Sequence, residues 1–240
     1  ILDRGSVHQM GTIIRGENGQ PFPYFFGYKT DGVFQNWGEV YAYTNAEGKL
    51  VQPDAQPGDF RYQDINGDGS ITAEGDRTNL GKCVPSWTYG INASIDWKGI
   101  DFSMVWQGVA GNKIFDATRR TDIPTMNQPK YVLNRWTGEG STNEYPRFTN
   151  VDPNQNWSKA SDFFIKDASY FRLKNVTLGY TLPVNWTNKI FVKKFRVYVA
   201  CENALTFTKY DGFDPEIADY VDRGIYPQAR TVQFGANITF

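Results

Sequence analysis

The last ten residues of the sequence alternate without a break between apolar and polar side chains. In residues 231–240, every second position from Val232 to Phe240 is apolar, and the positions between them are polar or glycine. This two-residue period is typical of a β-strand whose faces meet different surroundings. A strand of this length crosses a bilayer when it is tilted, and lipid-facing and lumen-facing residues alternate in transmembrane barrels. The pattern favours a membrane-spanning strand, and the alternative is the last strand of a soluble sandwich.

Four earlier segments repeat this alternation: residues 88–97, 100–109, 175–182 and 195–201. Residues 7–15 and 22–28 are weaker strand candidates. Five strands cannot close into a barrel, which needs about eight or more, and an open sheet would leave unpaired edges in lipid. We therefore expect an all-β fold in which antiparallel strands form part of a large transmembrane β-barrel. The chain would be an incomplete barrel by itself and would pair with the remainder of its own polypeptide.

The connections between these segments alternate in length. The two-residue hairpin at 98–99 and a turn at Pro183 are short, whereas residues 110–165 and 203–229 are long and polar. Outer-membrane barrels have short periplasmic turns and long extracellular loops, so this order favours the membrane interpretation. Residues 29–86 form another long region. We expect this region and residues 110–165 to be extracellular loop regions that carry function or internal structure.

The composition excludes several classes of function. The 25 Lys and Arg residues balance 26 Asp and Glu residues, which argues against a nucleic-acid partner. His8 is the only histidine, which leaves little scope for histidine-based metal sites, catalytic triads or proton shuttles. Two cysteines cannot form a disulfide framework, although a single bridge between Cys83 and Cys201 is left open. We expect that the chain is not an enzyme.

Six segments, in order along nearly the whole chain, carry a family resemblance. They are FFGYKTDGVF at 25–34, PGDFRYQDINGDG at 57–69, WQGVAGN at 106–112, SYFRLKNVTLGY at 169–180, NALTFTKY at 203–210 and YPQART at 226–231. Together with the strand that ends in phenylalanine, they resemble the C-terminal part of the SusC/RagA-type TonB-linked outer-membrane transporters of Bacteroidetes-like bacteria. Each segment alone would be a weak signal.

The resemblance implies a large plugged barrel, of which 22 strands is the general pattern. Such transporters lie in the outer membrane among its lipids and import oligosaccharides or peptides. Their energy is relayed by the TonB complex, and they work under a surface lipoprotein of the SusD type. In this family the plug and the TonB-contacting segment lie toward the N-terminus, so this chain, which begins at Ile1 without an initiator methionine, would supply wall and loops. Its terminal Phe240 resembles the signal by which the outer-membrane assembly machinery recognises its clients.

Residues 64–72, DINGDGSIT, fit the first half of a calcium-binding loop. Oxygen ligands at alternate positions converge on one cation, and Gly69 allows the sharp turn. The standard loop has a bidentate acid at position 12, where this sequence has Gly75. Asx turns, which need no metal, are the alternative. The predicted calcium ligands are the side chains of Asp64, Asn66 and Asp68, the backbone carbonyl of Ser70 and, after a one-residue bulge, Asp76.

Substrate-binding residues cannot be identified from the sequence, and only weak candidates stand out. Trp136, Tyr145 and Trp157 lie in the long regions, where aromatic rings could stack on sugar rings. Large aromatic residues also dominate protein cores, so packing of the loops against each other is the favoured alternative. Two other functions compete with transport. One is a secreted, calcium-stabilised β-sandwich that binds carbohydrate, and the other is an all-β glycoside hydrolase, which needs two carboxyl groups flanking a sugar.

Overall fold

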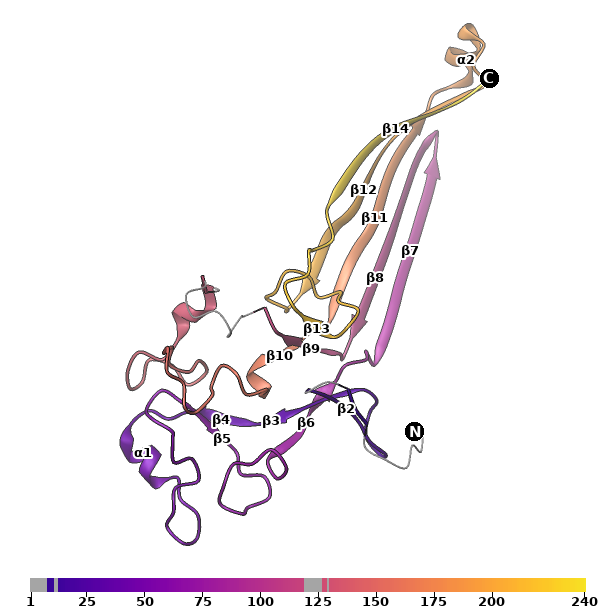
Figure 1. Cartoon of the computed structure of the whole chain (residues 1–240). Coiled ribbons are helices and arrows are strands. Elements are labelled where there is room, and N and C mark those ends of the chain that lie inside the picture. The colour runs from indigo at the N-terminus through magenta and orange to yellow at the C-terminus, as the bar shows by residue number, and fades with distance from the viewer. Residues whose placement is uncertain (1–7, 11–12, 119–126, 129) are drawn as a thin grey trace. The chain divides into compact units, whose positions relative to one another are not determined.

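The computed structural model describes residues 8–10, 13–118, 127–128 and 130–240. The chain divides into two compact units (Figure 1). Unit 1 comprises Ile1–Val84, Lys113–Lys166 and Tyr220–Arg223, and unit 2 comprises Pro85–Asn112, Asp167–Asp219 and Gly224–Phe240. Each unit is formed by segments that are distant in the sequence.

Unit 2 is built on one antiparallel sheet of five strands, which lie side by side in Figure 1. Each strand pairs with the strand that precedes it in the chain of this unit, so the sheet is a meander. Their order across the sheet is β14 (Thr231–Thr239), β12 (Lys194–Thr208), β11 (Tyr170–Thr181), β8 (Ile100–Ala110) and β7 (Trp87–Trp97). Strands of about 9–11 residues cross a bilayer when tilted, and all five strands reach this length.

The short connections lie at one end of this sheet, as the sequence predicts. Lys98 and Gly99 join β7 to β8, and both have the positive φ angles, 49° and 87°, that a tight hairpin turn of this twist requires. The link from β11 to β12 contains α2 (Val184–Thr187) and η3 (Asn188–Ile190), and α2 lies at the same end of the sheet as the C-terminus (Figure 1). The longer connections therefore leave the opposite end.

The strand register brings apolar side chains together on one face of the sheet. Along one row, Ile95 lies opposite Phe102, Phe102 opposite Leu178, Leu178 opposite Val199 and Val199 opposite Phe234. Ile95 is 63% exposed and Phe234 is 83% exposed. A continuous apolar face of this kind is rare on soluble monomers.

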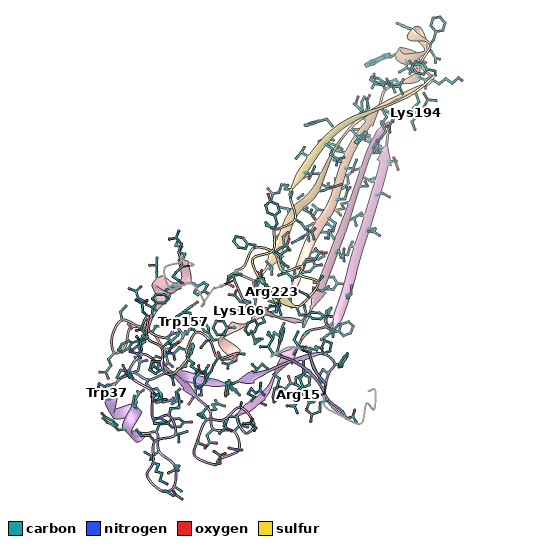
Figure 2. All side chains as sticks on the ribbon, in the orientation of Figure 1. Arg15, Trp37, Trp157, Lys166, Lys194 and Arg223 are labelled. Carbon is teal, nitrogen blue, oxygen red and sulfur yellow. The ribbon has the colours of Figure 1, made fainter. Side chains whose placement is uncertain are left out.

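The other face of the sheet is polar. The adjacent row consists of Ser94, Ser103, Thr177, Ala200 and Gln233, each opposite the next. Side chains project from both faces of the sheet in Figure 2. The period-two pattern of the sequence is thus converted by the register into one apolar and one polar surface.

Two strands extend beyond their predicted bounds. β11 begins at Tyr170 instead of residue 175, and β12 runs to Thr208 instead of ending at residue 201. The register of β11 shifts between Leu173 and Asn175 in its pairing with both neighbours. A bulge inserts an extra residue and moves the following side chains to the other face, so the alternation is interrupted where the strand continues.

Unit 1 contains three small sheets and short helical segments. The expected strand over residues 7–15 falls partly on residues 7, 11 and 12, which lie outside the described residues. Its described part forms two antiparallel strands, with His8 opposite Gly16, instead of one. The sheets are β1 (His8–Met10), β2 (Ile14–Gly16), β3 (Tyr24–Tyr28) and β6 (Arg77–Lys82); β4 (Thr30–Val33) and β5 (Phe60–Tyr62); and β10 (Ile165–Asp167), β9 (Lys113–Asp116) and β13 (Val221–Asp222).

The helical segments of unit 1 are α1 (Trp37–Ala42), η1 (Lys130–Asn134) and η2 (Asp162–Phe164). Asn36 caps α1 by accepting a hydrogen bond from the backbone N–H of Glu39 at 3.0 Å. Among the described residues, no helix has the length and apolar character that a membrane-spanning helix requires.

Unit 1 has a core of its own, made largely of aromatic side chains. Phe60 and Tyr62 of β5 are buried with Val33 of β4. A second cluster contains Val132, Trp157 and Phe164, and a third contains Phe34, Val40 and Ala55. The regions 29–86 and 110–165 are therefore internally structured, since both contribute to this core.

Candidate functional site

An ion pair crosses the polar face of the five-stranded sheet. Arg196 of β12 donates from Nε to Oδ1 of Asp101 of β8 at 2.8 Å and from Nη2 to Oδ2. β11 lies between these strands, and the pair passes over Gly179. A Cβ at Gly179 would lie 2.5 Å from both the Arg196 guanidinium and the Asp101 carboxylate. Glycine at this position therefore leaves the space that the ion pair occupies.

A second ionic cluster holds a long connection against the same face. Arg172 of β11 is 3% exposed and donates hydrogen bonds to Asp214 at 2.7 Å, to Glu216 at 3.0 Å and to Thr206 at 3.0 Å. Lys174 donates to the Glu216 carboxylate at 2.6 Å. Asp214 and Glu216 lie in the connection between β12 and β14. Hydrogen bonds that involve charged groups are about twice as strong as neutral ones, so this cluster anchors the connection to the sheet.

The surroundings of Asp214 set its protonation. Burial raises the pKa of this carboxyl group, but hydrogen bonds from Arg172 and from the backbone N–H groups of Gln228 and Glu216 outweigh burial. The pKa is lowered overall, and the carboxylate is the stable form at neutral pH.

Sequence reasoning missed this cluster. Arg172 precedes the bulge of β11, where the alternation is out of phase, and Asp214 lies in a polar connection that resembles an ordinary solvated loop. No period or spacing in the sequence brings the two side chains together. Cys83 and Cys201 are free thiols in the structure, and burial raises the pKa of Cys83 to about 12.

A buried polar network joins the two long regions of unit 1. The Asp59 carboxylate is fully buried and accepts hydrogen bonds from Arg147 Nε at 2.5 Å and from Asn156 Nδ2 at 2.8 Å. Asn156 also accepts from the backbone N–H of Phe60 at 2.7 Å, and Gln52 donates to Asn154 at 2.8 Å. Because buried polar groups are costly unless they are paired, this network holds the two regions in one arrangement.

The three candidate stacking residues lie in or beside the core of unit 1. Trp157, which Figure 2 labels in unit 1, is 5% exposed, and its Nε1 donates to the carbonyl of Arg147 at 2.9 Å. Trp136 packs against the Val33 cluster, and Tyr145 meets Phe163 edge-on with ring centroids 5.5 Å apart. These contacts occupy the rings with protein neighbours. Substrate contact by Trp136, Tyr145 or Trp157 stays a prediction.

The predicted calcium loop is closed by hydrogen bonds. Asp64 accepts from the backbone N–H groups of Gly67 at 2.7 Å and Gly69 at 2.8 Å. Asp68 accepts from both the backbone N–H and the hydroxyl of Ser70 at 2.9 Å. Hydrogen bonds from Asn66 and Ser70 lower the pKa of Asp68. These are Asx turns, the arrangement expected of such a sequence without a metal.

The Asp76 side chain joins the two ends of this loop through hydrogen bonds. It is fully buried, and its two oxygens accept from the backbone N–H groups of Ile65 at 2.8 Å and Thr72 at 2.6 Å. In the part of the chain that the structure describes, no group of three or more His, Cys, Asp or Glu side chains is arranged to hold a metal ion. Calcium binding by Asp64, Asn66, Asp68, Ser70 and Asp76 stays a prediction, as does the role of Phe240, which is 77% exposed after β14.

The chain is similar to several curated TonB-dependent receptors. No protein-family model matches the chain. TonB-dependent receptor P3 of Formosa agariphila is 30% identical over 238 residues, which are 92% of this chain and 22% of that protein. TonB-dependent receptor P26 of the same organism is 30% identical over 270 residues, covering 100% of this chain and 26% of that protein. TonB-dependent receptor SusC of Bacteroides thetaiotaomicron is 24% identical over 229 residues, covering 95% of this chain and 21% of that protein.

Solved structures share the fold. The RagAB peptide importer in its open-open state superposes on 100% of this chain and 25% of that chain, with a TM-score of 0.73 and 23% identity. This chain spans roughly a quarter of the length of the relatives that it matches. The order of its antiparallel strands, the apolar and polar faces of its sheet and its curated relatives all indicate the same family. The chain is therefore part of a TonB-dependent receptor of the SusC/RagA type, a family of outer-membrane β-barrel proteins.

Proposed function

We propose that this chain forms part of the wall and the substrate-facing loops of an outer-membrane importer for oligosaccharides or peptides. The observation that carries the proposal is the two-faced sheet of unit 2. Its apolar face carries exposed side chains such as Ile95, Leu178 and Phe234, and its other face is polar and holds the pair of Asp101 and Arg196. Lipid on one side and a water-filled lumen on the other satisfy both faces.

The proposed role is passage and not catalysis. The polar face offers hydroxyl, amide and charged groups to a hydrated solute, and the connection that Arg172 anchors lies on the same face. The relatives are receptors, and the structural neighbour is a peptide importer. Import by the complete receptor would take its energy from the TonB complex through a plug elsewhere in the protein.

A surface lipoprotein of the SusD type is the proposed partner at the outer side. Unit 1 is the proposed docking and substrate-contacting region, because its two long regions are held rigid by a buried network. A rigid loop surface lowers the entropy that binding costs. The name of the neighbouring RagAB importer indicates an assembly of two components in that protein.

The β-sandwich alternative has less support. A sandwich buries the apolar face of each sheet against a second sheet. Among the described residues of this chain, that face remains exposed, as Ile95 and Phe234 illustrate. A water-soluble carbohydrate-binding module with such a surface would aggregate.

Spin-label accessibility in the membrane-embedded receptor tests the wall assignment. Labels at Ile91, Ile95 and Ile238 should collide with lipid-soluble oxygen, and labels at Asn92 and Asn237 with a water-soluble nickel complex. Equal water exposure at all five positions would refute the membrane wall.

Uptake by cells tests the transport assignment. A strain that lacks this receptor should lose growth on the glycans or peptides that the wild-type strain imports, and reintroduction of the gene should restore it. Affinity purification of the receptor in mild detergent should also retain a SusD-like lipoprotein encoded by the same organism. Unchanged uptake of every glycan and peptide tested would contradict the import role.

A further inference from the structure

Unit 2 contains a cavity of mixed polar and apolar lining beside the polar face of its sheet, between the end of β12 and the connection that leads to β14. Its volume is about 320 Å³, near the lower end for ligand-binding pockets. This volume accommodates a small terminal group and excludes a folded partner. The residues that line it and matter here are Arg172, Asn203, Thr206, Asp214, Gln228 and Arg230.

The charges around the cavity leave an excess of positive charge. Arg172 and Arg230 line it together with one carboxylate, that of Asp214. Lys174 and Glu216, which do not line the cavity, form an ion pair in which their charges cancel. Arg172 is committed to Asp214, Glu216 and Thr206. The excess therefore resides on Arg230, an exposed side chain at the rim of the cavity that has no hydrogen bond or ion pair with the described residues.

Donor groups beside Arg230 point to the same chemistry. The side-chain oxygen of Gln228 accepts from Lys174 at 3.1 Å, which leaves its amide N–H groups to donate to a ligand. A guanidinium offers two parallel N–H groups that match the two oxygens of a carboxylate. The combination of a free guanidinium and a free amide donor selects an anion with planar, bidentate geometry.

The walls of the cavity are already held in place. The Asp214 carboxylate accepts from the backbone N–H groups of Glu216 at 2.9 Å and Gln228 at 3.0 Å. Asn203 Nδ2 donates to the carbonyl of Ala229 at 3.0 Å, next to Arg230. These bonds tie two separate parts of the connection to each other and to β12. The backbone on either side of Arg230 is thus fixed, so a ligand has to order only the exposed side chains of Gln228 and Arg230.

We propose that this cavity binds a carboxylate group of the imported substrate, with Arg230 as its main ligand and Gln228 as a second donor. This inference rests on the proposed import function and adds the chemical feature that the receptor recognises. A peptide C-terminus and a uronic acid both carry this group. The cavity recognises the carboxylate in either.

Titration calorimetry on the intact detergent-purified receptor tests the inference with matched probes. The peptide arm compares trialanine with trialanine amide, and the sugar arm compares digalacturonic acid with neutral galactobiose. At least one carboxylate probe should bind about tenfold more tightly than its neutral counterpart, the effect of one charge-assisted hydrogen-bonding contact. The arm that shows the preference identifies the source of the carboxylate. Absence of a preference in both arms overturns the inference.

Arg230→Gln isolates the cavity from general charge effects. This substitution should abolish the preference and leave the receptor folded, because the Arg230 side chain has no partner among the described residues. Lys209→Gln removes the same charge from an exposed position nearby and should retain the preference. A preference that survives Arg230→Gln overturns the inference. The result is independent of the import function, because calorimetry measures binding without transport: normal uptake without carboxylate preference refutes only the cavity, whereas carboxylate binding without uptake refutes only the import role.

Discussion

The two units of this protein treat their large apolar side chains in opposite ways. In unit 1, Phe60 and Tyr62 are 2% and 0% exposed, and the polar groups around them are paired within the unit. In unit 2, Ile95 and Phe234 are 63% and 83% exposed on an uncovered face. Unit 1 is therefore stabilised by contacts inside the chain. Unit 2 depends on lipid and on further strands, and the same kind of substitution should have different consequences in the two units.

The largest effect is expected from Asp59→Ala in unit 1. Removing this fully buried carboxylate takes away the ionic partner of Arg147 and one acceptor of Asn156, which should destabilise unit 1 by about 3–5 kcal/mol. Hydrogen exchange of the unit 1 amides in the intact receptor measures the loss. The control is Asp31→Ala, which removes an exposed partner of Arg61 and should cost less than about 1 kcal/mol. Equal effects of both substitutions would mean that the buried network does not hold unit 1 together.

Adjacent residues of β11 sharpen the contrast between the faces of unit 2. Val176→Arg places a charge on the apolar face and should reduce the stability of the folded barrel by about 2–4 kcal/mol. Thr177→Arg places the same charge on the polar face and should cost much less. Both variants are unfolded with urea in lipid vesicles, and the unfolded fraction is read from the change in electrophoretic mobility. The urea dependence gives the loss of stability of each variant. A greater loss with Thr177→Arg would reverse the assignment of the faces.

Gly179→Ala tests the packing of the polar face. The new methyl group would displace the ion pair of Asp101 and Arg196, and overpacking of this kind costs about 1–3 kcal/mol. Gly90→Ala in β7 is the matched control, since the nearest atom to its Cβ would be 3.3 Å away. The control should change stability by less than about 1 kcal/mol in the same urea assay. Identical urea midpoints of unfolding for the two variants would show that the ion pair can move without loss of stability.

The ionic cluster of unit 2 should respond to acid in a defined direction. The pKa of Asp214 is lower in the folded protein than its ordinary value of 3.8. Its carboxylate therefore contributes stability that is fully present above pH 3.8 and is lost as the pH falls through the lower folded pKa. Exchange protection of the Gln228 amide should stay constant between pH 7 and pH 5, after correction for intrinsic rates, and fall below pH 3.8. Loss of protection already near pH 6, or unchanged behaviour in Asp214→Asn, would contradict this role.

The smallest effect is expected from calcium. A loop that lacks the standard final ligand should bind weakly, with a dissociation constant of about 10⁻⁴–10⁻³ M. Millimolar calcium would then stabilise the loop by about 0.4–1.4 kcal/mol. Calorimetry should detect heat in the intact receptor, lose it in Asp64→Ala and retain it in Asp54→Ala. No heat with the unmodified receptor would leave the loop as a set of Asx turns closed by Asp76.

The alternation in the sequence predicted most of the unit 2 sheet, and it failed at particular residues. The hairpin at Lys98 and Gly99 and the order of five strands follow from side-chain period and connection length. The first residues of β11 did not, because the register shift between Leu173 and Asn175 changes the face to which later side chains point. A bulge is a property of two paired strands and leaves no clear mark in one of them.

The candidate sites also differ in how far the sequence could predict them. The residues of the calcium loop are consecutive, so local spacing suggested both the metal site and its alternative, the Asx turns. Arg172 and Asp214 are 42 residues apart, and Asp59 and Asn156 are 97 residues apart. Contacts over such separations depend on the path of the chain. The composition of the intervening residues does not encode them in any readable pattern.

The sequence by itself determined that these segments are strands with one apolar and one polar face, because alternation is a local property of an extended backbone. It also carried the family resemblance, which the curated relatives confirm. Only the tertiary structure decided that the long regions of unit 1 share a core and that Arg172 holds the connection to β14 against the polar face. Those features are pairings between distant residues, whose energy exists only after the chain has brought them together.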